Sequence, residues 1–462
     1  MELLPAGSRA HARHRRSREA GLVVGGRDVL VEALVGPVAL AEEVDLAPPT
    51  RHRAKLSLPR QRARQRLGLA RPDGLLLSAR DFRHKPRGPC GARSYGHLMT
   101  RVIADVLASF DGPPHLLLAV HGTADPERIA AQVDAFCIAH LHAGVAEHEF
   151  FVANVGAVHG LRLTDGRRVI VKVHQASVDV AYLQLVADCQ RLLSASGFPC
   201  PAPLEAPARL AGGVATVEQM LRDGGRADGH DPRVRGALAA TLAELIELLR
   251  PLAADPRLHL HRELLHSAAV HGPFPAPHDA RFDFAACTAG TAWIDTLAAA
   301  ARQRNDEQVG ETVVGHTDWK VGHLRFDDRG QVVAVFDWDS LALTHEPAVV
   351  GEAAHAFCAD WEAENYICTP TIDEALAFIA DYEAARGRPF SAEERSACHA
   401  AFVYACAYTA RCEGSDARTG YGQHAAGPPP RTVPATSYRA LLAEHGPRLL
   451  GVAPPAGLPS PR

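Results

Sequence analysis

The chain has 462 residues, with 47% hydrophobic and 22% charged side chains, which is the ordinary composition of globular proteins. It contains no run of about 18 apolar residues, so we expect no membrane-spanning helix. Its first residues lack the apolar stretch of a secretory signal, so we expect a cytoplasmic protein. The ten cysteines include no Cys-x-x-Cys pair, which argues against a disulfide scaffold and against a zinc ribbon.

Charge is distributed unevenly along the chain. Residues 1–93 carry 19 Lys and Arg against 9 Asp and Glu, whereas residues 94–462 carry 30 against 44. The first segment shows little periodicity, so we predict a poorly ordered basic leader there. A basic tract attracts nucleic-acid phosphates, but this one holds no recognisable DNA-binding element and few aromatic residues. We therefore do not expect nucleic acid to be a partner.

Ordered structure is predicted to begin with helices and to continue with strands. Apolar residues at helical spacing predict helices over 94–110 and 125–144, and the second begins at an N-cap, Asp125. Alternating and β-branched stretches over 149–174 predict strands. A helix is then expected over 178–194.

The second half of the chain is predicted to be mostly helical. A strand-like stretch ending at residue 221 precedes a long predicted helix over 236–252, and a hairpin with its turn at 327–330 precedes further helices. Strands followed by helices indicate the α+β class. We predict a β-rich N-lobe with its preceding helices within 94–222, a helical C-lobe within 223–424 and a Pro-rich tail over 425–462.

Three groups of polar residues carry the candidate chemistry. Lys172 lies inside VIVKV, where a buried ammonium requires an anionic partner. The loop HTDWKVGH contains Asp318, Lys320 and His323. Asp337 follows in FDWDS, and the intervening hairpin returns the chain toward that loop. The sequence has no phosphate loop of the G-x-x-x-x-G-K-[ST] type and no G-x-S-x-G or H-E-x-x-H motif.

Two carboxylates and a lysine on a strand suit phosphoryl transfer. That reaction uses one carboxylate to orient a hydroxyl, another to hold Mg²⁺ and a cation to fix the phosphates. The sequence resembles the aminoglycoside phosphotransferase and choline kinase-like family over roughly residues 125–415, because HTDWKVGH, FDW and VIVKV match its catalytic loop, metal-binding segment and strand lysine. The resemblance implies a two-lobed protein-kinase-like fold and an ATP- and Mg²⁺-dependent kinase.

Carried over by position, the resemblance gives roles to individual residues. Asp318 would be the catalytic base, Asp337 the main metal ligand and Lys172 the clamp on the ATP phosphates. Lys320, two residues after Asp318, would contact the transferred phosphate. The adenine would meet the backbone of three consecutive residues, Gln219, Met220 and Leu221.

Three departures from the family pattern leave an alternative open. His323 stands where the family has an asparagine that binds the second metal, and imidazole suits Mg²⁺ less well than oxygen does. The helix after Lys172 offers only Gln184 and Asp188 in place of a glutamate. The glycine-rich turn is reduced to Gly156 and Gly160. The alternative is a catalytically impaired, nucleotide-binding pseudokinase with a regulatory role.

The acceptor is expected to be a small molecule that carries a hydroxyl group. An acidic set in the C-lobe has two readings, as solvated helical faces or as a site for a cationic acceptor such as an aminoglycoside or an amino alcohol. The members of this set are Asp360, Glu362, Glu364, Asp373 and Glu374.

Overall fold

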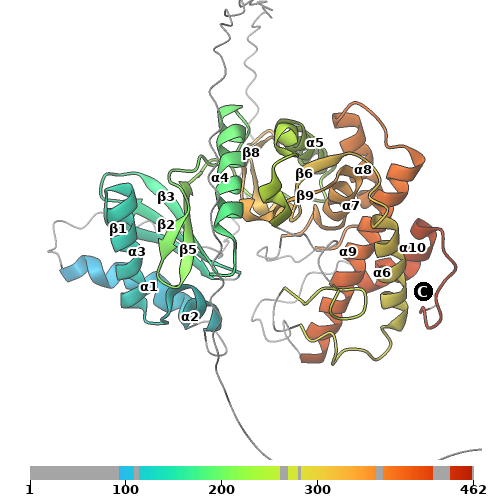
Figure 1. Cartoon of the computed structure of the whole chain (residues 1–462), viewed down its shortest axis with the longest axis horizontal. Coiled ribbons are helices and arrows are strands. Elements are labelled where there is room, and N and C mark those ends of the chain that lie inside the picture. The colour runs from blue at the N-terminus through green and yellow to red at the C-terminus, as the bar shows by residue number, and fades with distance from the viewer. Residues whose placement is uncertain are drawn as a thin grey trace, which may run out of the picture. The chain divides into compact units, whose positions relative to one another are not determined.

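The structure is a computed structural model, and it divides the chain into two units, 1–76 and 77–462. It describes seven stretches of the second unit: 93–108, 114–153, 155–260, 269–278, 282–360, 368–419 and 437–459. The predicted basic leader lies outside the described residues, except for Arg93. We call the elements α1 to β5 the N-lobe and the elements α5 to α10 the C-lobe (Figure 1).

A five-stranded antiparallel sheet forms the N-lobe, in the order β1-β2-β3-β5-β4. Its strands are β1 (Val145–Ala153), β2 (Ala157–Leu163), β3 (Arg168–His174), β4 (Ala208–Leu210) and β5 (Gly213–Gln219). Side chains alternate across a strand, so Val169, Val171 and Val173 are fully buried on one face of β3. Lys172 therefore points from the opposite face.

Three helices precede the sheet and share its buried face: α1 (Arg93–Leu107), α2 (His115–His121) and α3 (Pro126–Leu141). Asp125 caps α3, since its Oδ1 accepts from Glu127 N at 2.9 Å and from Arg128 N at 3.4 Å. Ile129 and Val133 of α3 belong to the same apolar cluster as the buried valines of β3. This confirms the predicted helix and its start.

A chain of three buried histidines crosses this N-lobe core. Gln132 Oε1 accepts a hydrogen bond from His121 Nδ1 at 3.2 Å, because the Gln132 amide nitrogen donates to His121 O. His159 Nε2 then donates to His121 Nε2 at 3.2 Å, and His148 Nε2 donates to His159 Nδ1 at 3.0 Å. His148 Nδ1 is buried without a hydrogen-bond partner. The bonds are consistent with one proton on each ring, so all three histidines are neutral.

Helix α4 (Val180–Ala195) lies between the sheet and the C-lobe helices (Figure 1). Asp179 caps it by accepting from Ala181 N at 2.7 Å. Its buried residues Tyr182, Leu183 and Val186 belong to the large apolar cluster of the C-lobe. The helix thus ties the N-lobe to the C-lobe core.

The C-lobe is mostly helical. Its α-helices are α5 (Pro232–Leu249), α6 (Ala292–Asn305), α7 (Glu346–Ala356), α8 (Ile372–Ala385), α9 (Ala392–Thr419) and α10 (Tyr438–Leu450). Its short strands pair as β6 (Thr312–His316) with β9 (Leu341–His345), and as β7 (Leu324–Phe326) with β8 (Val332–Val335). Four 3-10 helices complete the fold: η1 (Arg250–Leu252), η2 (Pro256–Leu260), η3 (Val321–His323) and η4 (Trp338–Ser340).

These elements confirm the α+β class and the two-lobed, kinase-like arrangement. The predicted Pro-rich tail differs, because helix α10 forms within it and buries Tyr438, Leu441 and Leu442 against the C-lobe core. Apolar side chains at helical spacing behind the Ser437 cap explain this helix. Among the residues described, no helix combines the length and apolarity needed to cross a bilayer.

Candidate active site

The loop that carries Asp318 follows β6 and is fixed by the buried His316. Its Nε2 donates to the carbonyl oxygen of Phe336 at 3.1 Å, and its Nδ1 accepts from Asp318 N at 3.3 Å. These two bonds define a neutral tautomer, and burial lowers the pKa of His316. His316 therefore joins the loop that carries Asp318 to the segment that carries Asp337.

Asp318 has its carboxylate in contact with a cation. Lys320 Nζ lies 2.8 and 2.7 Å from the two Asp318 oxygens, and His323 Nδ1 lies 3.7 Å from Oδ2. Burial raises the pKa of Asp318, but His323 and Lys320 outweigh burial and hold that pKa below its usual range. The carboxylate is thus ionised at neutral pH, and 39% of the side chain is exposed to the cleft and solvent.

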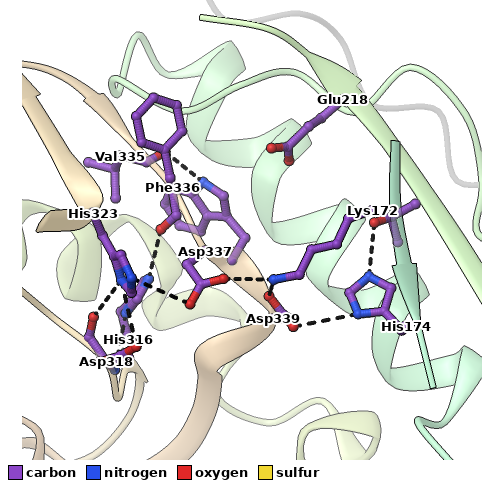
Figure 2. Close-up of polar contacts among 12 residues, drawn as sticks. Lys172, His174, Glu218, His316, Asp318, His323, Val335, Phe336, Asp337 and Asp339 are labelled. Atoms are coloured by element: carbon purple, nitrogen blue, oxygen red, sulfur yellow. Dashed lines mark hydrogen bonds and ion pairs between the residues drawn. The ribbon is translucent and has the colours of Figure 1, made fainter. Parts of the chain in front are cut away.

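His323 lies between the two aspartates. Its Nδ1 donates to the carbonyl oxygen of Asp318 at 3.0 Å, and its Nε2 faces Asp337 Oδ2 at 3.8 Å. A backbone carbonyl on Nδ1 is a usual arrangement for a histidine that binds metal through Nε2. Figure 2 shows the ring between the two carboxylates.

A metal ion fits among these three side chains. Asp318, His323 and Asp337 each offer one ligand atom, and those atoms lie within 4.8 Å of one another. The two carboxylate oxygens suit Mg²⁺, whereas the imidazole suits Mn²⁺ or Zn²⁺ better. The hairpin β7–β8 brings Asp337 back to the loop, as the sequence predicts.

Asp337 has an unusual backbone conformation. Its φ and ψ are 66° and 48°, in the left-handed region that Asp and Asn tolerate better than most residues. The next residue, Trp338, is buried, and its indole nitrogen donates to Val335 O at 2.9 Å. Anchoring Trp338 in the core helps to turn the Asp337 side chain into the cleft.

Lys172 meets the two acids of the FDWDS segment across the cleft (Figure 2). Its Nζ lies 2.7 Å from Asp337 Oδ1 and also contacts Asp339 Oδ1. Burial alone lowers the pKa of Lys172, but the carboxylates of Asp339 and Asp337 outweigh it and raise that pKa. The anionic partner that the sequence requires is therefore present.

The two residues of α4 considered as partners of Lys172 have other contacts. Gln184 Nε2 donates to Asp188 Oδ1 at 3.0 Å. Asp188 pairs with Arg191 at 2.7 Å and with Arg257 at 2.9 Å. Neither residue pairs with Lys172, whose partners are Asp337 and Asp339.

The two remaining glycines of the β1–β2 region allow close packing. A Cβ on Gly156 would lie 2.9 Å from Val173 O, and a Cβ on Gly160 would lie 2.2 Å from a ring atom of Phe150. Both distances are too short for a side chain. Gly156 lets the β1–β2 turn approach β3 beside Lys172, whose Cε would lie 3.8 Å from a Cβ on Gly156, and Gly160 of β2 makes room for the Phe150 ring of β1.

The three residues predicted to bind adenine are not equally placed to contact a ligand in the cleft. Met220 and Leu221 line the cleft between the lobes. Gln219 N donates to Ala202 O at 2.9 Å, and Met220 N donates to Arg168 O at 3.2 Å. Because those two N–H groups are used within the N-lobe, Leu221 is the best placed of the three to donate to a base.

Glu218 is a residue that the sequence reasoning missed. It shares the cleft face of the sheet with Lys172, and Gln190 Nε2 of α4 donates to its Oε2 at 2.5 Å. Burial raises the pKa of Glu218 to about 7. The sequence does contain a sign of this residue, because a single acid in the β-branched stretch VATVEQ is as anomalous as Lys172 in VIVKV.

The cleft continues from the N-lobe sheet into the C-lobe, with a volume of about 1990 Å³. Single ligand pockets are usually about 300 to 1,000 Å³, so the cleft has room for two molecules. Its C-lobe wall includes three acids, a histidine and an aromatic residue: Glu352, Glu413, Asp416, His355 and Tyr438. The rings of Tyr438 and His355 are in tilted contact, with centroids 4.5 Å apart and an interplanar angle of 38°.

A comparison with family models identifies the domain. Residues 160–363 match the model described as "Phosphotransferase enzyme family". This stretch of the chain is similar to that family. It contains Lys172, Asp318 and Asp337, so the predicted resemblance and the prediction of a phosphotransferase are confirmed. A comparison with curated proteins gave no match.

Solved structures of phosphotransferases show weaker likeness. An amicoumacin kinase in complex with AMP-PNP and Ca²⁺ is 14% identical, over 66% of this chain and 88% of that one, with a TM-score of 0.43. An aminoglycoside phosphotransferase from Alicyclobacillus acidocaldarius is 13% identical, over 66% and 91%, with a TM-score of 0.39. A macrolide 2'-phosphotransferase from Brachybacterium faecium is 14% identical, over 64% and 94%, with a TM-score of 0.38.

Proposed function

We propose that the protein is an ATP- and Mg²⁺-dependent kinase that transfers the γ-phosphate to a hydroxyl group of a small acceptor. The observation that carries this proposal is the group of Asp318, His323 and Asp337 ligand atoms within 4.8 Å of one another. Lys172 stands next to this group, in contact with Asp337. Phosphoryl transfer depends on such positioning and charge neutralisation.

Each residue of the site has a separate role in the proposed phosphoryl transfer. Asp318, held ionised, accepts a hydrogen bond from the acceptor hydroxyl and orients its oxygen toward the phosphate. Lys320 leaves Asp318 to meet the charge that develops on the phosphoryl oxygens. Asp337 and His323 would hold Mg²⁺, which when bound neutralises phosphate charge. Lys172 binds the phosphates from the N-lobe side.

The C-lobe wall favours a cationic acceptor. Glu352, Glu413 and Asp416 line the cleft, and burial raises the pKa of Glu413. A positively charged ligand beside buried carboxylates is stabilised by their charge.

Two of the acids considered from the sequence pair with basic residues. Asp360 pairs with Arg226, and Glu374 pairs with His230 at 2.9 Å and caps α8. Glu362 and Glu364 lie outside the described residues. Asp360, Asp373 and Glu374 do not line the cleft, so the acceptor site that we propose uses the acids of the cleft wall.

A product assay tests the function. The protein is incubated with Mg-ATP and hydroxyl compounds in two groups, one cationic (aminoglycosides and amino alcohols) and one of neutral sugars, and products are identified by mass spectrometry. We expect phosphorylated product from the cationic group. Product from neutral sugars alone would contradict the charge argument. ATP binding without product from either group would instead support the pseudokinase.

Replacing His323 with asparagine tests the metal site. Because an amide oxygen suits Mg²⁺ better than imidazole does, we expect His323→Asn to lower the Mg²⁺ concentration for half-maximal activity about tenfold. The wild type should prefer Mn²⁺ to Mg²⁺, and the variant should lose that preference. Metal titrations at saturating ATP measure both effects. An unchanged Mg²⁺ requirement would show that His323 does not bind the metal.

A further inference from the structure

Lys172 has no acidic partner on the neighbouring helix, although α4 faces the cleft beside it. The α4 residues that line the cleft include Leu183, Val186 and Gln190, none of which is acidic. Gln190 donates to Glu218. The lysine must therefore be fixed from elsewhere in the fold.

Asp339 contacts two residues of β3 at once. Its Oδ1 contacts Lys172 Nζ, and its Oδ2 lies 3.5 Å from His174 Nδ1. Residues 172 and 174 share one face of β3, so the carboxylate spans both side chains (Figure 2).

Helix α4 fixes the backbone of Asp339. The hydroxyl of Tyr182, a buried residue of α4, lies 2.8 Å from the carbonyl oxygens of both Asp339 and Leu341 and shares its proton between them. The helix thus positions the acid indirectly, through a phenol that holds the segment carrying it.

Asp337 differs from Asp339 in its surroundings. Asp337 belongs to the group of possible metal ligands, whereas Asp339 does not. We propose that Asp339 is a positioning residue that holds Lys172 in place of an acid from the helix and leaves Asp337 available to the metal. This inference rests on the proposed function for the part played by Lys172 at the phosphates.

The loss of Asp339 has a specific consequence. Lys172 would keep a single carboxylate partner, Asp337, and would compete with the metal for it. Asp339→Asn should therefore weaken metal binding even though the proposed ligands are untouched. A residue with only a structural role would not produce this effect.

Because the chain contains few lysines, the reactivity of Lys172 can be measured directly. The chain has four lysines, and only Lys172 and Lys320 fall within the described residues. An amine acylating reagent followed by mass spectrometry reports the reactivity of each lysine separately. Only the neutral amine reacts, so a fall of one unit in the pKa of Lys172 raises its labelling rate about tenfold.

The experiment compares three variants with the wild type at pH 9. Asp339→Asn should raise the labelling rate of Lys172 at least tenfold, with Lys320 as the internal reference. Asp328→Asn, the same change at an exposed turn residue, should leave it unchanged. Asp339→Glu, which restores the charge, should keep Lys172 protected. Unchanged labelling in the folded Asp339→Asn protein would overturn the proposal.

The second part of the experiment measures the metal affinity of the same variants. Mn²⁺ binding in the presence of ADP, followed by electron paramagnetic resonance, should weaken about tenfold in Asp339→Asn and remain unchanged in Asp328→Asn. Equal metal affinity in all variants would overturn the division between Asp337 and Asp339. If the wild type binds no nucleotide while labelling responds as expected, the proposed function fails and the ion pair between Asp339 and Lys172 stands.

Discussion

Replacing Asp318 with asparagine should lower kcat about a thousandfold, in the middle of the range for the loss of a positioned general base. The amide keeps the size of the side chain but does not orient the acceptor hydroxyl through a negative charge. Lys320, which lies 2.7 Å from the carboxylate, would also lose its partner. Initial rates at saturating ATP and acceptor measure the effect, and KM for ATP should change little because Lys172 is untouched.

The matched control is Asp328→Asn in the exposed hairpin turn, where kcat should stay at the wild-type value. Asp328→Asn should unfold at the wild-type temperature, whereas Asp318→Asn should unfold below it, because the mostly buried Lys320 loses its carboxylate partner. Phosphorylated product formed by Asp318→Asn at the wild-type rate would remove Asp318 from the mechanism. A large rise in KM for ATP with unchanged kcat would instead make it a nucleotide-binding residue.

Acidification should destabilise the N-lobe through its buried histidine chain. Burial lowers the pKa values of His121 and His148 to about 4 each, and it places that of His159 well below 6.5. These rings are neutral in the folded state and become charged in the unfolded state below pH 6.5. The free energy of unfolding should therefore fall as the pH drops from 6.5 toward 4, by about 1.4 kcal/mol per pH unit for each histidine once the unfolded ring is fully protonated.

Urea unfolding of the wild type and of His148→Gln between pH 4.5 and 7 tests this expectation. A glutamine amide can still donate to His159 but cannot titrate, so the dependence should be shallower by about 1.4 kcal/mol per pH unit at the acid end. Carboxylates contribute equally to both proteins and cancel in the comparison. Parallel curves for the two proteins would show that His148 is already charged in the folded state.

The sequence predicts the part of the site that depends on local patterns. Lys172 is found because a charge in a β-branched strand is anomalous, and Asp337 is placed beside Asp318 because a short hairpin returns the chain. The lysine's partner could not be predicted, because Asp339 lies 167 positions away and the pairing depends on how the lobes meet. The same holds for Tyr182, whose role is a hydrogen bond to a distant carbonyl.

Helix α10, Glu218 and the acids of the cleft wall were not predicted from the sequence. Helix α10 was not predicted, because the run of prolines after residue 425 indicated a tail without regular structure. Glu218 was not predicted as a site residue, because the stretch VATVEQ was interpreted only as a strand. The cleft-wall acids Glu352 and Glu413 lie on α7 and α9. Only the packing of these helices makes their carboxylates neighbours of one cavity.

Helix α10 determines where the chain can be shortened without loss of the cleft. The proline-rich stretch after residue 425 invites truncation for expression or crystallisation. Tyr438 lies beyond it, and its hydroxyl shares one proton between His355 O at 3.0 Å and Cys368 O at 2.6 Å. A shortened protein would lose part of the cleft wall together with the aromatic neighbour of His355. Such a protein could bind nucleotide normally and still be inactive toward its acceptor, so substrate screens require the full chain.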